Sequence, residues 1–451
     1  MPVARGLSVQ RLRQLATGGA ASIAVSVAAT NVLRIVSSMT LTRLLDSHAY
    51  GVVGVITSIT VVLTMLSDIG LLGFIVRHKE GDDPTFLDQI WTLRALRGLG
   101  LTLLMAALAK PAAILLGKPE LAPVIAVWSI SFLLDGLSSL AFATAIRNQQ
   151  LWRLSSLDLS SNVTMLLVSI TCALIWPSYW AMIAGMTAGA LVKLALSYVL
   201  FPATRRRFHF HRGRSRELWQ FSRFIALSSM LSLLILQSDK LVLARLMPLS
   251  AFGLYAIAVT LSSAPGSLAS PYATRILYPI YARIAREAPD TLREVYYRAR
   301  RNFSMLYMFA VGGMLGSAPL IVAILYDPRY RGVAPFLELI TISAVLRMSS
   351  LAANEVMVAT GRMNVTFLAN VFRVAWLAIG GGIGLWTGNI MLLVAMVGTT
   401  ELPGMICYWW FLHRAHLLDL REEAYALAAG GSGAGLGWLL ASAVLHLFPG
   451  L

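Results

Sequence analysis

The chain alternates between long apolar runs and short breaks that are rich in charge, proline or glycine. Each run has on the order of 20 residues or more, the length that a helix needs to cross about 30 Å of hydrocarbon. Thirteen such runs predict thirteen transmembrane helices. The first six are Ala16 to Leu45, Ala49 to Val76, Gln89 to Leu116, Leu121 to Ile146, Ser155 to Trp176 and Tyr179 to Pro202. The others are Glu217 to Met247, Ser250 to Ile284, Asn302 to Tyr326, Val333 to Thr360, Asn364 to Trp386, Asn389 to His413 and Ala424 to Phe448.

One phrase occurs twice, each time at the outer end of an apolar run. Leu41 to Gly51 reads LTRLLDSHAYG, and Leu243 to Gly253 reads LARLMPLSAFG. At a constant offset of about 202 residues, two leucines, an arginine, an alanine and a glycine recur. The phrase therefore predicts two copies of one membrane unit. Because six spans precede the second copy, we expect parallel repeats related by an axis along the membrane normal.

Composition and charge agree with this membrane architecture. Hydrophobic residues make up 57% of the 451, charged residues only 13%, and the mean hydropathy is +0.71. The formal net charge of +16 comes from 37 Lys and Arg against 21 Asp and Glu. If the amino terminus is cytoplasmic, the inner flanks collect about 22 of these cations and the outer flanks about 6. Membrane topology thus accounts for the positive charge, and no nucleic-acid partner is indicated.

These patterns predict an all-α integral membrane protein, with two parallel six-helix repeats and one extra C-terminal helix. The predicted domains are a cytoplasmic tail at 1–15, a first lobe at 16–202, a basic cytoplasmic linker at 203–216, a second lobe at 217–413, and a linker with the thirteenth helix at 414–451. Arg283 to Arg301 mixes apolar residues with arginines, which predicts an amphipathic helix on the inner leaflet.

The sequence indicates neither an enzyme nor a cofactor. No loop exceeds about 20 residues, and no glycine-rich phosphate loop followed by lysine appears. Cys172 and Cys407 each lie inside an apolar run without a partner at metal-ligand spacing. His209 and His211 stand in an arginine-rich loop without supporting acids, which is typical of a solvated loop. We therefore predict no catalytic residues and no metal.

Several motifs resemble those of the oligosaccharide flippase family of the MOP superfamily. They are the Arg-Leu-Leu then Tyr-Gly exit of the first span, Ser67 to Gly70 (SDIG), Gln237 to Lys240 (QSDK), Ala251 to Tyr255 (AFGLY) and Leu277 to Pro279 (LYP). The resemblance covers about twelve of the thirteen spans. It implies two six-helix lobes around a central cavity, which carry a polyprenyl-pyrophosphate-linked oligosaccharide to the outer leaflet by alternating access. The odd thirteenth span departs from the twelve or fourteen that are usual there.

The same resemblance implies a biological setting. Such proteins, similar to lipopolysaccharide and exopolysaccharide exporters and to the lipid II flippase, work in the bacterial cytoplasmic membrane. They feed exopolysaccharide, capsule or O-antigen assembly. A polysaccharide polymerase and a chain-length regulator are the partners expected beside the lipid-linked sugar and membrane lipid.

Cationic side chains are the candidates for binding the pyrophosphate, which favours arginine donors in a site of low dielectric constant. Nine lie within or close to spans: Arg34, Arg94, Arg97, Lys193, Arg223, Lys240, Arg275, Arg347 and Arg373. A charge at the bilayer centre costs at least about 2.5 kcal/mol, so each is functional or paired. The predicted substrate-binding residues are Arg34, Arg275, Arg373 and Lys240. Arg34 and Arg275 lead, because the resemblance puts their helices at the cavity.

The other cations have structural alternatives. Arg94, Arg97 and Arg223 lie near helix starts, from which they can snorkel to the inner interface. Lys193 can pair with Asp135 inside the first lobe.

Among the acidic residues, Asp68 and Asp239 are the candidates for coupling to a proton or sodium ion. For Asp68 the alternative is a structural Asp-Ile-Gly turn, and for Asp239 it is local neutralisation together with Lys240. Pro265, Pro271, Pro319 and Gly380 to Gly384 interrupt spans and predict bending.

A drug or cation antiporter of the related MATE kind is the main alternative function. Such a pump needs carboxylates and aromatic rings around its cavity, whereas the polar positions inside these spans are mostly arginine and lysine. A membrane-embedded polymerase or ligase needs a sizeable outer loop, and the outer loops here have only a few residues. The sign of the charges therefore favours an anionic lipid substrate.

Overall fold

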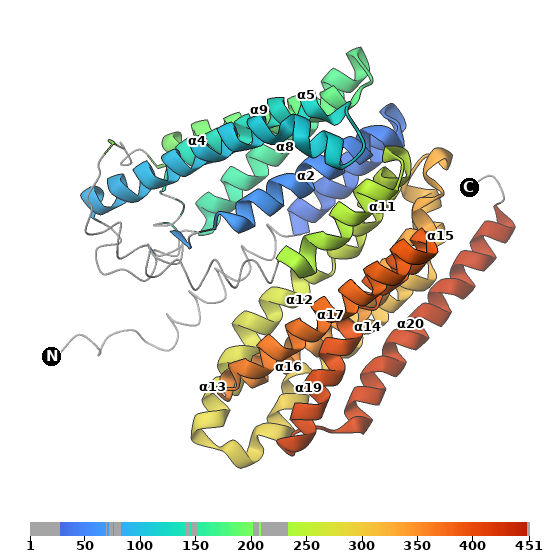
Figure 1. Ribbon diagram of the computed structural model, residues 1–451. Coiled ribbons are helices and arrows are strands. Elements are labelled where there is room, and N and C mark those ends of the chain that lie inside the picture. Colours follow the sequence, from blue (N-terminus) through green and yellow to red (C-terminus); the bar gives the residue numbers. More distant parts are fainter. Residues whose placement is uncertain are drawn as a thin grey trace. The chain divides into compact units, whose positions relative to one another are not determined.

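The computed structural model describes residues 28–68, 70–71, 75, 83–140, 142, 145, 151–201, 207–208 and 233–448. Over these ranges the regular structure is helical throughout and no residue is in a strand (Figure 1). The all-α fold predicted from the sequence is confirmed. The tail at 1–15, most of the basic linker at 203–216, Arg223, His209 and His211 lie outside the described residues.

Nine helices in the described ranges are long and apolar enough to cross a bilayer. A tenth span is the pair formed by residues 289–316 and 318–325, which bends by 72° at its break. A shorter apolar stretch, Leu121–Leu137, occupies the predicted fourth span. Residues 28–44 and 233–246 are helical parts of the predicted first and seventh spans, whose beginnings are not described. The protein is a multi-pass membrane protein.

The chain divides into two compact units, one with residues 1–45 and 56–233 and the other with 46–55 and 234–451. In the first unit Trp128 donates to the Thr60 hydroxyl (3.0 Å) and Ser161 to the Gly189 carbonyl (2.9 Å). The helices of this unit are residues 28–44, the later part of α2 (Ser47–Leu66), α4 (Pro84–Leu115), α5 (Leu121–Trp128), α6 (Ile130–Leu137), α8 (Leu151–Ile175) and α9 (Tyr179–Val199).

The second unit surrounds α16, whose bilayer-spanning window is 61% buried, the largest share among the candidate spans of the described chain. Its helices are residues 233–246, α11 (Leu249–Ser263), α12 (Gly266–Tyr272), η1 (Ala273–Leu277), α13 (Tyr278–Glu287), α14 (Leu292–Gly316), α15 (Ala318–Leu325), α16 (Val333–Ala359), α17 (Met363–Thr387), α18 (Ile390–Gly398), α19 (Glu401–Arg414) and α20 (Leu420–Leu447). Two 3₁₀ turns, Pro289–Thr291 and Pro328–Tyr330, complete it.

The helix interruptions follow proline more closely than glycine. α11 ends just before Pro265, and Pro319 stands at the start of α15, directly after the 72° bend. Pro271 lies inside α12, which leads into the π-helical segment η1. The glycines from Gly380 to Gly384 do not break α17, because Gly380 and Gly384 instead make room for side chains of α18.

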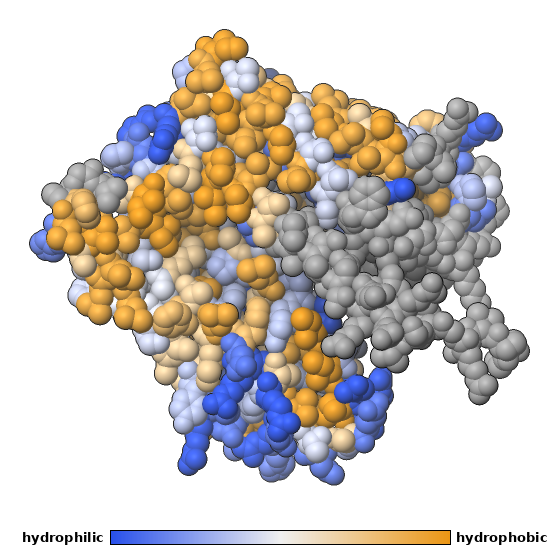
Figure 2. Space-filling view, turned by 180° about the vertical axis from the view of Figure 1, so that it is seen from behind, coloured by the Kyte–Doolittle hydropathy of each residue, from blue (hydrophilic) through white to orange (hydrophobic). Residues whose placement is uncertain are grey.

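The prediction of one amphipathic surface helix from Arg283 to Arg301 is wrong. α13 ends at Glu287, a 3₁₀ turn follows, and α14 begins at Leu292. The arginines of this segment therefore belong to the ends of two long helices. Figure 2 shows hydrophilic residues gathered at the lower end of the molecule, where α13 lies in Figure 1, and apolar residues over the sides.

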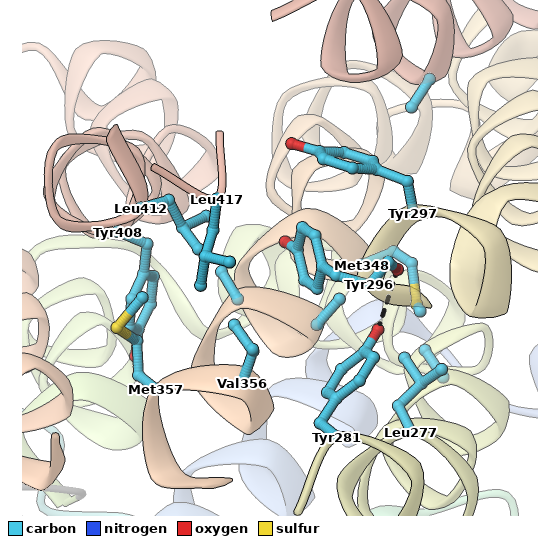
Figure 3. Close-up of a cluster of buried hydrophobic side chains, with 14 of the residues drawn as sticks. Leu277, Tyr281, Tyr296, Tyr297, Met348, Val356, Met357, Tyr408, Leu412 and Leu417 are labelled. Atoms are coloured by element: carbon cyan, nitrogen blue, oxygen red, sulfur yellow. Dashed lines mark hydrogen bonds between the residues drawn. The ribbon is translucent and has the colours of Figure 1, made fainter. Parts of the chain in front are cut away.

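The main core of the second unit contains an unusual number of tyrosines. Tyr281, Tyr296 and Tyr408 are fully buried, and Tyr281 donates to the Tyr296 carbonyl at 3.2 Å (Figure 3). Met348, Val356 and Met357 of α16, with Leu412 and Leu417, fill the space between these rings. The Tyr408 hydroxyl bonds to Asn354 at 3.1 Å, whereas the Tyr296 hydroxyl is buried without a partner among the described residues.

The thirteenth helix, α20, lies along α14 for most of its length (Figure 1). A side chain on Gly312 or Gly316 would overlap backbone of α20, and one on Gly433 or Gly437 would overlap backbone of α14. Small residues at such a seam let two membrane helices approach closely. α20 is thus a full member of the second unit, although it has no counterpart in the twofold repeat.

The two repeated glycines, Gly51 and Gly253, lie where α2 and α11 approach each other closely. A Cβ on Gly51 would overlap the carbonyl of Leu249, and a Cβ on Gly253 would overlap the carbonyl of Ser47. Ser47 and Leu249 are themselves related by the repeat offset, so the crossing of α2 with α11 is reciprocal. Within the second unit, the ends of the two copies of the phrase are therefore in contact, around Gly51 and Gly253.

Candidate functional site

Arg34 and Arg275 are both exposed and free of polar partners among the described residues. Arg34 lies on the helix 28–44, about 15 Å from its last residue at 1.5 Å per residue. Arg275 projects from η1, between Pro271 and α13. Neither forms a hydrogen bond or an ion pair with any described side chain or backbone group. Because π-helical turns occur frequently at functional sites, the position of Arg275 is notable.

Arg373 is held by a carboxylate of its own lobe. Its guanidinium forms an ion pair with Glu401 of α19 at 2.7 Å and a hydrogen bond with Asn370 at 2.8 Å. The two charged side chains are only 12% and 15% exposed. A side chain on Gly404 would come within 2.6 Å of the Arg373 Nε, so this glycine leaves space for the guanidinium. Arg373 therefore ties α17 to α19.

Asp239 and Lys240 are neighbours in sequence that point to different surroundings. Lys240 donates to the Leu236 carbonyl at 3.0 Å and to Gln237 at 3.2 Å. Asp239 is 9% exposed and accepts a hydrogen bond from Tyr255 of α11, and its other carboxylate oxygen is buried without a partner in the described structure. An unsatisfied buried carboxylate oxygen is costly, which indicates a place for a proton or a cation.

A cavity of about 370 Å³ opens beside Asp239. Its other lining groups are almost all apolar, and Ser238 is the exception. They come from helix 233–246, from α17 and from α18: Leu234, Ser238, Val242, Val374, Leu377, Ala378, Gly381, Gly382, Leu385, Leu393, Met396 and Val397. One carboxylate in such surroundings suits a small cation or proton and offers little to a sugar with many hydroxyl groups.

Asp68 forms a local turn, which was the structural alternative to a coupling role for this residue. Its side chain accepts from the backbone N–H of Gly70 at 2.9 Å, and Gly70 has a φ of 65°, which favours glycine. Arg97 donates to the Ser67 hydroxyl at 2.9 Å and to the Thr64 carbonyl at 3.0 Å. These bonds fix the end of α2 against α4.

Two ion pairs in the first unit correct the expected pairing of Lys193 with Asp135. Asp135 instead pairs with Arg94 at 2.9 Å, and Lys193 pairs with Asp158 of α8 at 2.9 Å. Within the described ranges, no group of three or more His, Cys, Asp or Glu residues is arranged to hold a metal ion. The first unit thus offers paired charges around Asp135 and a separate, exposed Arg34.

The comparison with known families decides what kind of protein this is. The family described as "Polysaccharide biosynthesis protein" matches residues 40–335, well over half of the chain. The chain belongs to this polysaccharide biosynthesis protein family. The flippase resemblance inferred from the sequence is confirmed at this level.

Curated relatives in this family are similar over most of their length. The lipopolysaccharide biosynthesis protein WzxC of Escherichia coli (strain K12) is 25% identical over 409 residues, covering 86% of this chain and 80% of that protein. The succinoglycan biosynthesis transport protein ExoT of Rhizobium meliloti (strain 1021) is 22% identical over 390 residues, covering 85% and 77%.

Solved structures show the fold of this family member. The lipid II flippase MurJ in an inward closed conformation superposes with a TM-score of 0.72 at 11% identity, over 92% of this chain and 91% of that one. A multidrug resistance MATE transporter in an inward-facing conformation gives 0.61 at 12% identity, over 88% and 95%. The chain therefore has the fold shared by MOP-superfamily transporters.

Arg347 is the intramembrane cation of this polysaccharide biosynthesis protein that sequence reasoning did not select. It lies near the middle of α16, is half-buried, and makes no hydrogen bond or ion pair with any described residue. The sequence places it among nine cations, but no pattern along the chain reveals which of them have a carboxylate facing them.

Proposed function

We propose that the protein is a flippase that moves a polyprenyl-pyrophosphate-linked oligosaccharide from the inner to the outer leaflet by alternating access. Each sugar hydroxyl costs several kcal/mol in hydrocarbon without a partner, so the head group needs a polar route through the protein. The prenyl tail can remain in lipid. The relatives named for lipopolysaccharide biosynthesis and succinoglycan transport support this class of substrate.

The main support for this proposal is that the charged side chains without a described partner inside these spans include three arginines. Arg34, Arg275 and Arg347 have no carboxylate partner among the described residues, and all three are cations inside predicted spans. Arginine matches a pyrophosphate in charge and in its forked geometry, and it stays charged in a site of low dielectric constant. In this proposal, Arg34 in the first lobe and Arg275 in the second contact the pyrophosphate.

A MATE-like cation antiporter is the second candidate, and Asp239 is what favours it. Its unpartnered oxygen and the apolar cavity beside it suit a small cation. We assign this site to coupling rather than to cargo, because the cavity offers few polar groups for a large substrate. If the cycle is coupled to an ion, Asp239 exchanges a proton or sodium ion, and Asp68, held in its turn, is the weaker coupling candidate.

Voltage is the alternative energy source. A substrate with about two negative charges that moves outward gains roughly 2.3 kcal/mol per charge per 100 mV if the charges cross uncompensated. The proposal favours voltage slightly, because Asp239 is already bonded to Tyr255. Transport in proteoliposomes that persists at zero potential but stops without an ion gradient would reverse this preference.

The proposed setting is the bacterial inner membrane with the amino terminus in the cytoplasm, as the distribution of basic residues indicates. Exopolysaccharide, capsule or O-antigen assembly uses the product, with a polysaccharide polymerase and a chain-length regulator as partners. In this role the protein catalyses no covalent chemistry and requires no cofactor.

The test is polymer export in cells that depend on this protein. Arg34→Ala and Arg275→Ala should each abolish export while the protein remains in the membrane. Arg→Lys at either position should restore only part, because lysine cannot form the bidentate contact. Arg283→Ala, at an exposed position paired with Glu287, is the matched control and should export normally. Normal export by both alanine variants would disprove the assignment of these arginines.

A further inference from the structure

Arg347 lies at mid-depth in the most enclosed span of the described chain. Fourteen residues of α16 lie on its outer side and twelve on its inner side, which corresponds to about 21 Å and 18 Å. α16 packs against α11, α12, η1 and α13 to α15, and also against α17 to α20. A cation at this depth cannot reach an aqueous interface along its own helix.

Two buried arginines of this unit have counter-charges built into the lobe. Arg300 pairs with Glu423 where the two side chains are only 3% and 1% exposed, and Arg373 pairs with Glu401. Among the described residues, no carboxylate pairs with Arg347. Tyr307 lies within electrostatic range, but its hydroxyl donates to the Ala344 carbonyl at 3.1 Å, and a phenol is neutral at pH 7.

The side chain of Arg347 lies against an interruption in the neighbouring helix. Its Cδ, Nε and Cζ lie 3.9 to 4.0 Å from where a Cβ on Gly266 would be, and Gly266 follows Pro265 at the break between α11 and α12. No side chain at Gly266 covers the guanidinium there. Its nitrogens are absent from the fully buried, unpartnered atoms of the described structure, so they remain accessible.

An unpaired guanidinium in the bilayer centre is costly, and mid-membrane charges that persist are used for function. We propose that Arg347 contacts a phosphate oxygen of the lipid-linked substrate when the pyrophosphate passes mid-depth, beside the break between α11 and α12. This rests on the proposed function and adds to it a third arginine, on a helix other than those of Arg34 and Arg275. Without substrate, the guanidinium of Arg347 lacks a counter-charge, and the phosphate of the bound substrate supplies one.

The proposal makes a distinctive prediction about stability. If Arg347 were structural, its removal would destabilise the protein. If it awaits an anion, Arg347→Gln should melt at the same temperature as the wild type or higher, because an uncompensated charge is gone. Arg300→Gln should lower the melting temperature, because it strands Glu423.

Binding is measured with farnesyl pyrophosphate, a short prenyl pyrophosphate, by the rise in melting temperature of the purified full chain in nanodiscs. The wild type should be stabilised in a dose-dependent manner. Arg347→Gln should weaken the apparent affinity by about tenfold or more, as the loss of a charge-assisted hydrogen bond predicts. Arg347→Lys should recover part of it. Arg362→Gln removes an exposed charge at the start of α17 and should bind like the wild type.

The outcomes separate the two proposals. Equal stabilisation of the wild type and Arg347→Gln, together with loss in Arg275→Ala, would overturn the role of Arg347 and leave the flippase proposal standing. No response in the wild type would count against both. Equal Arg347-dependent stabilisation by phosphatidylglycerol or by inorganic pyrophosphate would show a general phosphate site and overturn its assignment to the substrate.

Discussion

Two helix crossings in the second unit are built on glycine, but they differ in length and in charge. The α14–α20 seam runs from the amino-terminal parts of both helices to Gly437, and the buried pair of Arg300 with Glu423 crosses it. Tyr297 and Ser349 also bond Glu423, at 3.2 and 3.3 Å. Within the second unit, the α2–α11 crossing joins residues 46–55 to the start of α11, around Gly51 and Gly253.

The α14–α20 seam is closed by a buried ion pair, whereas the α2–α11 crossing depends on close backbone packing. An ion pair buried to this degree cannot open without stranding a charge, so α14 and α20 stay together. α2 behaves differently, because residues 46–55 belong to the second unit and the helix continues in the first. We infer that α20 stiffens the second lobe, whereas the α2–α11 crossing is the part of the fold at which the chain passes from one unit to the other.

Breaking the buried pair should have the largest effect. Glu423→Gln leaves Arg300 buried without a counter-charge and should cost about 3–5 kcal/mol, measured by chemical unfolding in detergent micelles. The double variant Arg300→Met with Glu423→Leu should recover most of that loss. A double variant no better than the single one would show that the seam depends on the charges themselves.

Filling the α14–α20 seam comes next. Gly316→Val places a side chain against the backbone of Ala434 and should cost about 1–3 kcal/mol. Gly435→Val is the matched control on α20, since nothing lies within 4 Å of its Cβ position. Equal melting temperatures for the two variants would contradict the close approach of these helices.

Alanine at the repeated glycines should act through one shared contact. Gly51→Ala and Gly253→Ala should each cost on the order of 1 kcal/mol and reduce export, because either one forces α2 away from α11. The double variant should cost less than the sum, since the first methyl already separates the helices. Gly100→Ala, with open space around it, is the control. Strict additivity would mean that the two glycines do not share a contact.

The smallest expected effect is at the amino-terminal end of α20. Desolvation opposes the shift, but the backbone N–H groups of Arg421 and Glu422 and the guanidinium of Arg293 hold the pKa of Asp419 below its usual value. Asp419 caps α20, so Asp419→Ala should cost about 1 kcal/mol. Its contribution is present above the unfolded-state pKa of about 3.9 and is lost as the pH falls through the lower folded-state pKa.

The pH dependence tests this cap directly. Between neutral and strongly acidic pH, the wild type should lose slightly more stability than Asp419→Asn, which keeps the cap without the charge. The measurement is the unfolding midpoint in detergent as a function of pH. Parallel curves would indicate that the charge contributes nothing.

Hydropathy alone predicted the helices closely, because the bilayer fixes their length. The run from Val333 to Thr360 became α16 (Val333–Ala359), and that from Asn364 to Trp386 became α17 (Met363–Thr387). Hydropathy treated the predicted ninth span as one continuous run, although the chain turns by 72° near Pro319. Apolarity specifies that a segment lies in the membrane, but not whether it is straight.

Charge partners were not predictable in the same way. Lys193 has Asp158 opposite it rather than Asp135, and Arg373 has Glu401, 28 positions away. Such pairs depend on how each helix is rotated about its axis and on which helix lies beside it. Neither property is encoded by hydropathy, so the cations with and without partners were indistinguishable in the sequence.

The π-helical segment η1 has a consequence for comparing this chain with others. A π turn accommodates one residue more than the α-helix on either side, and one residue corresponds to about 100° of rotation. A helical wheel drawn continuously from Leu249 therefore assigns wrong faces to everything after Leu277. A relative that lacks one residue within 273–277 could form a regular α-helix there and still present its counterpart of Tyr281 on the same helix face. An alignment with such a relative needs a one-residue gap within this segment.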